Sequence, residues 1–361
     1  MDGPPPRPLN TGMQNAITVP ADLLHCQLTT VFTAWGMAEE HADTAATIMV
    51  ETDLSGVDSH GIGMLPHYQK LLREGRLNPR ATPVILRDNG VAVLVDGQKA
   101  IGHVPAHFAT ELAIEKAREH GIGVAAVTNS NHYGAAGWYA RMAAAEGMIC
   151  ISLTNSSHLL VPVNGTEPAL GTNPIAFSAP TRDPERPVLL DMATTTVAYG
   201  KVSIARRAGK PLPPGWAINE EGGPELDSAR ASDARRLAPL GGTREQGAHK
   251  GYGLALMVEI LCATLTGAGS GQLRTGHFFL VLNPATFRDR EGFQADLEDL
   301  LTRLRGNIPA APSNPVIIPG DPEHDTTVQR RQDGIPMMGT LVDEVRAVCD
   351  ESGAAFLLSD L

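Results

Sequence analysis

One histidine stands where a ligand site is expected. His132 lies in the segment VTNSNHYGAAG, residues 127–137, between an apolar run at 122–127 and an Ala-rich helical stretch. In α/β proteins, ligands favour the position where a strand ends beside a helix N-terminus, and such a terminus attracts anions. The plainer interpretation is a polar loop with one hydrogen-bonded histidine. His132 is therefore a candidate acid or base if other residues accompany it.

A second histidine, His60, lies in the stretch VDSHGIGMLPHY, residues 57–68. Ser59 and Asp58 precede it, and a neighbouring hydroxyl and carboxylate can fix the tautomer of a histidine and hold its pKa near neutrality. Gly61 lets the backbone approach a ligand closely. In the alternative interpretation, this stretch is the turn that ends a helix, and Ser59 and Asp58 make local hydrogen bonds.

Polar groups also stand at the ends of other expected elements. The stretch LGTNP, residues 170–174, comes just before an expected strand. Asp191 ends another strand, where it would bond a ribose hydroxyl, steady a histidine, or cap a helix. Lys250 precedes an apolar helix. Because a lysine at a helix N-terminus opposes the helix dipole, an anionic ligand would explain it; a surface lysine with a buried stem is the alternative.

Composition and charge exclude several classes of protein. Of the 361 residues, 42% are hydrophobic and 19% are charged, which predicts a packed core rather than disorder. The 29 basic and 40 acidic residues give a net charge of −11, and no long basic run argues for nucleic-acid binding. We find no secretory segment and no apolar run of ~18 or more residues. We expect a soluble, cytoplasmic protein without membrane contact.

The cysteines and the remaining histidines do not form a metal site. The four cysteines lie far apart in apolar surroundings, which predicts reduced core thiols rather than disulfides or zinc ligands. His103 and His107 have the spacing of a metal pair, but no third ligand lies nearby. We therefore expect no metal.

Residue periodicity predicts helices at both ends of the chain and alternating strands and helices between them. We expect helices at residues 24–35, 39–54, 106–119, 135–146, 197–207, 294–304 and 340–349, and a short one through Leu71 and Leu72. We expect strands at 91–95, 122–127, 148–153, 175–179, 188–190 and 277–282. The helix at 251–266 is apolar on nearly every face and should be buried. Residues 212–247 read as a long irregular loop.

The chain lacks the usual nucleotide-binding fingerprints. Residues 121–126, GIGVAA, fit the dinucleotide pattern but leave a helix and enter a strand, so no phosphate would meet a helix N-terminus there. We find neither a Walker A sequence nor the G-x-S-x-G elbow of serine hydrolases.

Seven ordered stretches together resemble the malate/L-lactate dehydrogenase family, which is distinct from the Rossmann lactate and malate dehydrogenases. That family also includes sulfolactate, ureidoglycolate and diketogulonate oxidoreductases and cyclic-imine reductases. The matching stretches are residues 53–68, 113–140, 153–180, 187–202, 239–242, 249–261 and 319–323. The resemblance covers about residues 20 to 340.

The resemblance implies a mixed α/β fold whose nucleotide-binding domain is not of the Rossmann type. We expect a disordered extension at residues 1–18, a helical domain from 19–85 with 292–361, and an NAD- or NADP-binding domain with a mixed sheet at 86–291. Members of the family are typically homodimers with active sites close to the subunit interface. No nucleic-acid partner is implied.

Site residues follow from the resemblance position by position. His132 and His60 match two active-site histidines, with Ser59 orienting His60. Expected substrate contacts are Met64, Tyr68, Thr172 and Asn173. Expected cofactor contacts are Ser156, Leu190, Asp191, Met192, Lys250, Gly251, Gly320 and Asp321.

The implied activity is hydride transfer between a nicotinamide cofactor and a 2-hydroxy or 2-oxo acid, with histidine acid–base catalysis. Two positions depart from the family pattern. Met64 stands where many relatives have arginine, so a bidentate clamp for a substrate carboxylate is missing. Asp321 stands where glutamate is common. Alternative interpretations are a reductase of a cyclic imine carboxylate and a catalytically silent, cofactor-binding relative.

Overall fold

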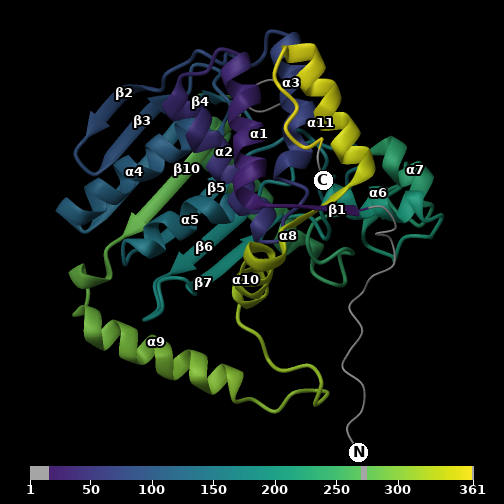
Figure 1. Cartoon of the computed structure of the whole chain (residues 1–361). Helices are drawn as coiled ribbons and strands as arrows, with labels where there is room; N and C mark the ends of the chain where they lie inside the picture. The colour runs from purple at the N-terminus through teal and green to yellow at the C-terminus, as the bar shows by residue number, and fades with distance from the viewer. Residues whose placement is uncertain (1–15, 270–274, 360–361) are drawn as a thin grey trace, which may run out of the picture. The chain divides into compact units, whose positions relative to one another are not determined.

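The computed structural model describes residues 16–269 and 275–359, and its fold is mixed α/β, as the sequence predicts (Figure 1). The chain divides into two compact units. The helical unit consists of residues up to Pro79, Thr181–Val188, and residues from Arg288 onward. The sheet unit consists of Arg80–Pro180 and Leu189–Phe287.

The helical unit joins the two ends of the chain. Its elements are β1 (Ala16–Val19), α1 (Ala21–Ala34), α2 (Glu39–Leu54), the 3-10 turn η1 (Ile62–Met64), α3 (Leu65–Arg73), α9 (Arg290–Arg305), α10 (Asp321–Asp333), β11 (Ile335–Met338) and α11 (Gly339–Ser352). Helix α1 buries Leu24, Leu28 and Val31 at helical spacing, which is the pattern that predicts it. Helix α1 contacts α2 and α11, and α11 contacts α3.

The first described strand lies inside the segment expected to be disordered. In β1, Ile17 pairs with Met337 and Val19 pairs with Ile335 of β11, antiparallel. The expectation of disorder is therefore wrong for residues 16–18, because their backbone hydrogen-bonding partner lies more than 300 positions away and leaves no local signal. The rest of the expected extension, residues 1–15, lies outside the described residues.

A seven-stranded mixed sheet forms the centre of the sheet unit, in the order β2-β3-β4-β10-β5-β6-β7 (Figure 1). The strands are β2 (Val84–Asn89), β3 (Ala92–Asp96), β4 (Ile122–Ser130), β5 (Ile149–Thr154), β6 (Ile175–Ala179), β7 (Val188–Met192) and β10 (Thr275–Leu282). Strands β3 and β4 are parallel, whereas β10 is antiparallel to both β4 and β5. Strands β5 and β6 are also antiparallel.

Alternate residues of β10 face different helices, as expected for a strand covered on both sides. Phe279 lies near the ring of Tyr139 in α5 (Ala136–Ala145), which follows α4 (His103–His120) in the sequence. Phe278 packs instead in a cluster with Val258 of α8 (Ala248–Glu259) and Cys262 of the π-helix η2 (Ile260–Thr264). Burial on both faces explains the high apolar content of the strand.

The helix expected at 251–266 is real, but the expectation that it is buried all round is wrong. Its inner side packs on the sheet through fully buried Val258 and Cys262. Its outer side exposes large apolar side chains to between 40 and 60%: Leu256, Met257, Ile260 and Leu265. A helix that lies on one face of a sheet can bury only the side turned toward the sheet.

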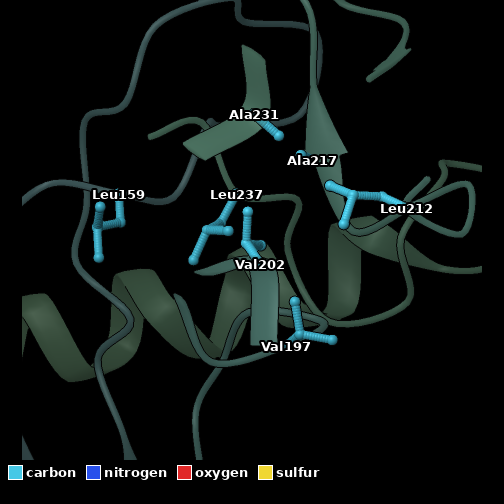
Figure 2. Close-up of a cluster of buried hydrophobic side chains, with 7 residues drawn as sticks. All are labelled: Leu159, Val197, Val202, Leu212, Ala217, Ala231 and Leu237. Atoms are coloured by element: carbon cyan, nitrogen blue, oxygen red, sulfur yellow. The ribbon is translucent and has the colours of Figure 1, made fainter. Parts of the chain in front are cut away.

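The segment 212–247 is more ordered than its composition predicts. It contains β8 (Ala217–Ile218), β9 (Pro224–Glu225) and α7 (Ser228–Ala234), whose N-terminus is capped by the Asp227 carboxylate. Together with α6 (Tyr199–Arg207), it encloses a small apolar core (Figure 2). The core residues are Leu159, Val197, Val202, Leu212, Ala217, Ala231 and Leu237. Their irregular spacing has neither the helical nor the strand period, which is why the pattern escapes notice.

Three of the cysteines, Cys150, Cys262 and Cys349, are buried and unpaired, as expected. Cys26 is also unpaired but exposed, because it lies on the outer side of α1; the expectation of four core thiols is wrong for this residue. Within the described residues, no helix has both the length and the apolar character that a membrane crossing requires.

Candidate active site

One edge of the sheet collects several of the residues singled out from the sequence. Because β4 and β5 are both antiparallel to β10, they run in the same direction and end at the same edge. His132 follows β4 and Ser156 follows β5. Strand β6 is antiparallel to β5, so Thr172 and Asn173, which precede it, lie at that edge too. Ligands of open α/β sheets bind beyond the ends of strands in this way.

The backbone holds the segment around His132 from both sides. The Gly102 amide donates to the His132 carbonyl oxygen at 3.1 Å. The Asn131 side-chain amide donates to the carbonyl oxygens of Lys99 and Ala100 at 2.9 and 3.0 Å. The Gly134 amide donates to Nδ1 of the His132 ring at 3.3 Å. Because Nδ1 accepts a hydrogen bond from the backbone, Nε2 is the candidate atom for proton exchange with a substrate.

Ser156 and Thr172 are joined directly. The Ser156 hydroxyl accepts from the Thr172 amide at 2.9 Å, and the two hydroxyl oxygens lie 3.1 Å apart. Asn173 is fully buried, with a φ of 35°, and its Oδ1 accepts from the Ser156 amide at 3.2 Å. Its Nδ2 donates to the Ala255 carbonyl and to Glu259 Oε2 of α8, at 3.0 and 2.9 Å. Both the oxygen and the nitrogen of the Asn173 side-chain amide are therefore hydrogen-bonded to protein groups. Through them Asn173 links the segment that follows β5 to helix α8.

Asp191 is the penultimate residue of β7 and contacts the first turn of α5. Its Oδ2 accepts from the Gly137 amide at 2.7 Å, although α5 has no side-chain cap from its own N-cap residue. The capping alternative considered from the sequence therefore has a physical basis, but the capped helix is α5 rather than the helix that follows Asp191. The neighbours Leu190 and Met192 are half-buried, whereas Asp191 is exposed.

Lys250 and Gly251 lie in the first turn of α8. Lys250 is exposed, whereas Gly251 is buried. A Cβ at Gly251 would lie 2.4 Å from both the amide nitrogen and the carbonyl oxygen of Leu240, so glycine lets the helix pack directly on residues 239–242.

In the helical unit, Ser59 Oγ lies 2.8 Å from Nδ1 of His60. Burial lowers the pKa of His60, so the neutral imidazole is favoured. Asp53 lies behind this turn: its Oδ2 accepts from the Ile62 amide at 2.8 Å. A Cβ at Gly61 would lie 1.9 Å from Asp53 Oδ1, so the glycine is required for the turn to close on the carboxyl group.

Met64 and Tyr68 lie one turn apart at the start of α3. Met64 is half-buried at the N-cap position of α3, where its thioether carries no charge. Tyr68 is fully buried, and burial raises the pKa of its phenol. Burial therefore favours the neutral phenol of Tyr68.

Gly320 and Asp321 form the start of α10, with Gly320 at a φ of 101°. The Asp321 carboxylate accepts from the Ile318 amide at 2.9 Å, from Arg186 Nε at 3.1 Å and from Arg305 Nη2 at 2.9 Å. Burial alone would raise the pKa of Asp321, but the amide and the two guanidinium groups outweigh burial and lower it. This carboxylate thus ties Thr181–Val188 to the C-terminal helices.

The sequence gives no indication of a role for Asp53. In the structure its carboxyl group makes a testable contribution to the pH dependence of the free energy of unfolding. Burial, followed by repulsion from Asp58, raises the pKa of Asp53 to about 8, although the Ile62 amide and Arg330 act against the rise. Between pH ~4 and ~8 the folded protein retains a proton that the unfolded chain has lost, so stability falls as pH rises, by about 1.4 kcal/mol per pH unit.

Asp53→Asn keeps an acceptor for the Ile62 amide and removes the titrating group. We expect the variant to lose most of this pH dependence and to be more stable than the wild type at pH 8. Urea unfolding at pH 5, 6, 7 and 8 measures the slope. Asp22→Asn, at an exposed position of α1, is the control and should retain the wild-type slope. Equal slopes for wild type and Asp53→Asn would contradict the assignment.

Comparison with known proteins identifies the family. The sequence pattern described as malate/L-lactate dehydrogenase matches residues 19–346. The malate dehydrogenase of Pyrococcus abyssi is 38% identical over 350 residues, which cover 94% of this chain and 96% of that protein. The L-sulfolactate dehydrogenase of Methanocaldococcus jannaschii is 35% identical over 334 residues, which cover 90% and 94%.

A solved structure agrees with the sequence relatives. The crystal structure of malate dehydrogenase from Entamoeba histolytica superimposes with a TM-score of 0.89 at 30% identity, and the match covers 94% of this chain and 99% of that one. The resemblance that the seven sequence stretches indicate is confirmed: the chain belongs to the malate/L-lactate dehydrogenase family.

Proposed function

We propose that this protein is an NAD- or NADP-dependent oxidoreductase that interconverts a 2-hydroxy acid and its 2-oxo acid. Relatives named as malate and sulfolactate dehydrogenases support this substrate class. The observation that carries the proposal is the gathering of His132, Ser156, Thr172 and Asn173 at one sheet edge, with the His132 ring held through Nδ1. Such an edge supplies a proton-exchanging group beside hydroxyls that orient a ligand.

The nucleotide cofactor supplies the hydride chemistry. The groups of the sheet unit fit such a ligand. The exposed Asp191 carboxylate suits a ribose diol, and the exposed Lys250 at the start of α8 suits a phosphate. We propose that Ser156, Leu190, Met192 and Gly251 complete these contacts.

The two residues of the helical unit expected to contact the cofactor have a different proposed role. The Asp321 carboxylate is engaged by three groups of its own unit. We therefore propose that the Gly320–Asp321 turn shapes the start of α10.

We propose that His132 exchanges a proton at Nε2. During reduction the substrate oxygen gains negative charge, and a donor placed at Nε2 stabilises that charge and supplies the proton; during oxidation the same atom accepts it. His60, held by Ser59, is the second proposed active-site histidine. Thr172, with its hydroxyl beside Ser156, is a proposed substrate contact, and Met64 and Tyr68 are proposed to shape the substrate end in the helical unit.

The test is an activity screen. NADH and NADPH are each mixed with the protein and with oxaloacetate, pyruvate, sulfopyruvate or a cyclic imine carboxylate, and the absorbance of the reduced nicotinamide is followed. We expect loss of absorbance with at least one 2-oxo acid. Turnover of the cyclic imine alone would replace the proposal with imine reduction. Cofactor binding without turnover of any compound would indicate a silent relative.

We also propose that the chain forms a homodimer through the exposed apolar face of α8 and η2. The side chains of this face, among them Met257 and Ile260, are 40% and 49% exposed, and a second copy would remove them from water. Light scattering should give twice the mass of one chain, and Ile260→Glu should give a single chain mass. Ile204→Glu, at a comparably exposed position on α6, should remain dimeric. A dimeric Ile260→Glu variant would contradict this interface.

We place the protein in the cytoplasm, since its four cysteines are unpaired although three are buried in the core. Recovery of the native protein in a membrane or secreted fraction of its own cells would contradict this location.

A further inference from the structure

A buried histidine, His277, lies next to the segment that carries His132. It stands near the start of β10, between β4 and β5, and its side chain has no exposed surface. On β5 its backbone partner is Thr154, and on β4 its partner is Val127. His277 therefore bridges the ends of the two strands that lead to His132 and Ser156.

Hydrogen bonds to both ring nitrogens fix the tautomer of His277. The Thr154 hydroxyl has two carbonyl oxygens within reach, that of Gly276 at 3.0 Å and that of Asn155 at 3.1 Å. Because its one proton goes to these carbonyl oxygens, it accepts from the ring nitrogen Nδ1, 2.7 Å away. The ring then carries its proton on Nδ1. Its Nε2 then accepts from the Ser130 hydroxyl at 2.8 Å, a much shorter contact than the 3.4 Å between that hydroxyl and the Asn131 carbonyl oxygen. The resulting chain of hydrogen bonds runs in one direction, from Ser130 to the carbonyl oxygens of Asn155 and Gly276.

This pair of hydrogen bonds requires the neutral form of the His277 ring, which burial favours. Burial, assisted by the neighbouring His103, lowers the pKa of His277 to about 3. A neutral ring with one donor and one acceptor matches its two hydroxyl partners, whereas a protonated ring would leave Nε2–H facing the Ser130 hydroxyl.

The ring of His277 also supports the residue on the other side of His132. The Tyr133 ring stacks on it with centroids 4.5 Å apart and planes 6° apart. The Tyr133 hydroxyl lies 3.3 Å from the Ser152 hydroxyl, and the Tyr139 hydroxyl donates to the Tyr133 carbonyl oxygen at 2.5 Å. His277 thus contacts Ser130, two residues before His132, and Tyr133, one residue after it.

We propose that His277 is a positioning residue: it holds the His132 segment in place by a hydrogen bond to Ser130 and a ring stack with Tyr133. This role rests on the proposed function of His132. His277 exchanges no proton with substrate. Its two contacts instead fix where the His132 backbone leaves the sheet, and a displacement of about 1 Å at a catalytic group can cost roughly 10²-fold in rate.

The test compares two substitutions on the same strand face. His277→Phe keeps an aromatic ring against Tyr133 and removes both side-chain hydrogen bonds. Phe279→Leu, two residues further along β10, removes core packing beside the rings of Tyr133 and His277, whose centroids lie 6.4 Å away, but leaves both hydrogen bonds of His277 in place. We expect His277→Phe to lower kcat by roughly 10- to 100-fold with KM for the 2-oxo acid changed less than about threefold. We expect Phe279→Leu to lower the Tm while keeping kcat. Equal kcat losses, or a wild-type kcat in His277→Phe, would overturn the proposal.

A measurement on the wild-type protein keeps the proposal testable if His277→Phe fails to fold. In ¹⁵N NMR spectra of imidazoles, we expect the ring of His277 to show a protonated Nδ1 and an unprotonated Nε2, unchanged from about pH 5.5 to about pH 9. The opposite tautomer, or titration in this range, would contradict the hydrogen-bond chain.

The spectra also separate this proposal from the proposed function. If His277→Phe shifts the His132 imidazole signals and Phe279→Leu does not, the positioning contact stands even if the activity screen fails. If the wild type is active and neither substitution alters the His132 signals, the positioning role fails alone.

Discussion

His132→Asn is expected to lower kcat by roughly 10²- to 10⁴-fold, the range that a positioned acid or base contributes. Asparagine is the informative replacement because its side-chain oxygen can still accept from the Gly134 amide, as Nδ1 does at 3.3 Å. The loop should therefore keep its course while losing the group that exchanges a proton at the Nε2 position. The nucleotide contacts proposed at Asp191 and Lys250 are not altered, so the Kd of the reduced cofactor should change less than about threefold.

Steady-state kinetics and a fluorescence titration with the reduced cofactor measure the two quantities separately. His120→Asn, at an exposed position at the end of α4, is the matched control and should behave as the wild type. A kcat within threefold of the wild type for His132→Asn, with cofactor bound, would show that His132 is not the proton-exchanging group.

Much of the local structure follows from periodicity. The expected bounds of α2, residues 39–54, and of β6, residues 175–179, agree with the structure residue for residue. In α2 the buried positions recur at helical spacing, and β6 is a short apolar run bounded by prolines. In these elements the spacing of the apolar residues predicts whether one side or both sides are buried.

Pairings over long sequence separations are not visible in such patterns. The hydrogen bond from Asn173 to Glu259 spans 86 positions, and the ion pair of Arg186 with Asp321 spans 135. Each residue alone has several local explanations, and only the fold selects the partner. The same reason hides His277, which reads as one more polar residue in the apolar strand at 277–282.

The sequence suggested which residues to consider for the candidate site, but it did not indicate which groups each side chain contacts. His132 and Thr172 were each expected beside the end of a strand, and the topology places both strand ends at one edge of the sheet. For Asn173 and Asp321, however, the resemblance implied contacts with ligands, while both side chains are engaged by protein groups. A motif indicates that a residue type is required at a position, but only the geometry shows which group that residue contacts.

Gly102→Ala is expected to combine a large loss of stability with a loss of activity. A Cβ at this position would lie 2.2 Å from the Asn131 carbonyl oxygen and 2.5 Å from that of His132. Both are backbone atoms, so the clash cannot be relieved by rotating a side chain. The φ of −58° is ordinary for alanine, which leaves the close approach as the reason for glycine here. We expect a loss of about 2–4 kcal/mol in the free energy of unfolding. The loss comes from overpacking and from a weaker hydrogen bond between the Gly102 amide and the His132 carbonyl oxygen.

The segment that must move to admit the methyl group is the one that carries His132, so kcat should fall roughly 10- to 100-fold even where the variant is fully folded. Gly200→Ala is the control: this glycine lies in α6 with no atom within 4 Å of its Cβ position, and alanine should stabilise the helix by about 0.5–1 kcal/mol. Urea unfolding and kcat measured on the same preparations separate the two effects. If Gly102→Ala loses stability but keeps the wild-type kcat, the segment relaxes without displacing the histidine, and the tight packing at Gly102 serves the fold alone.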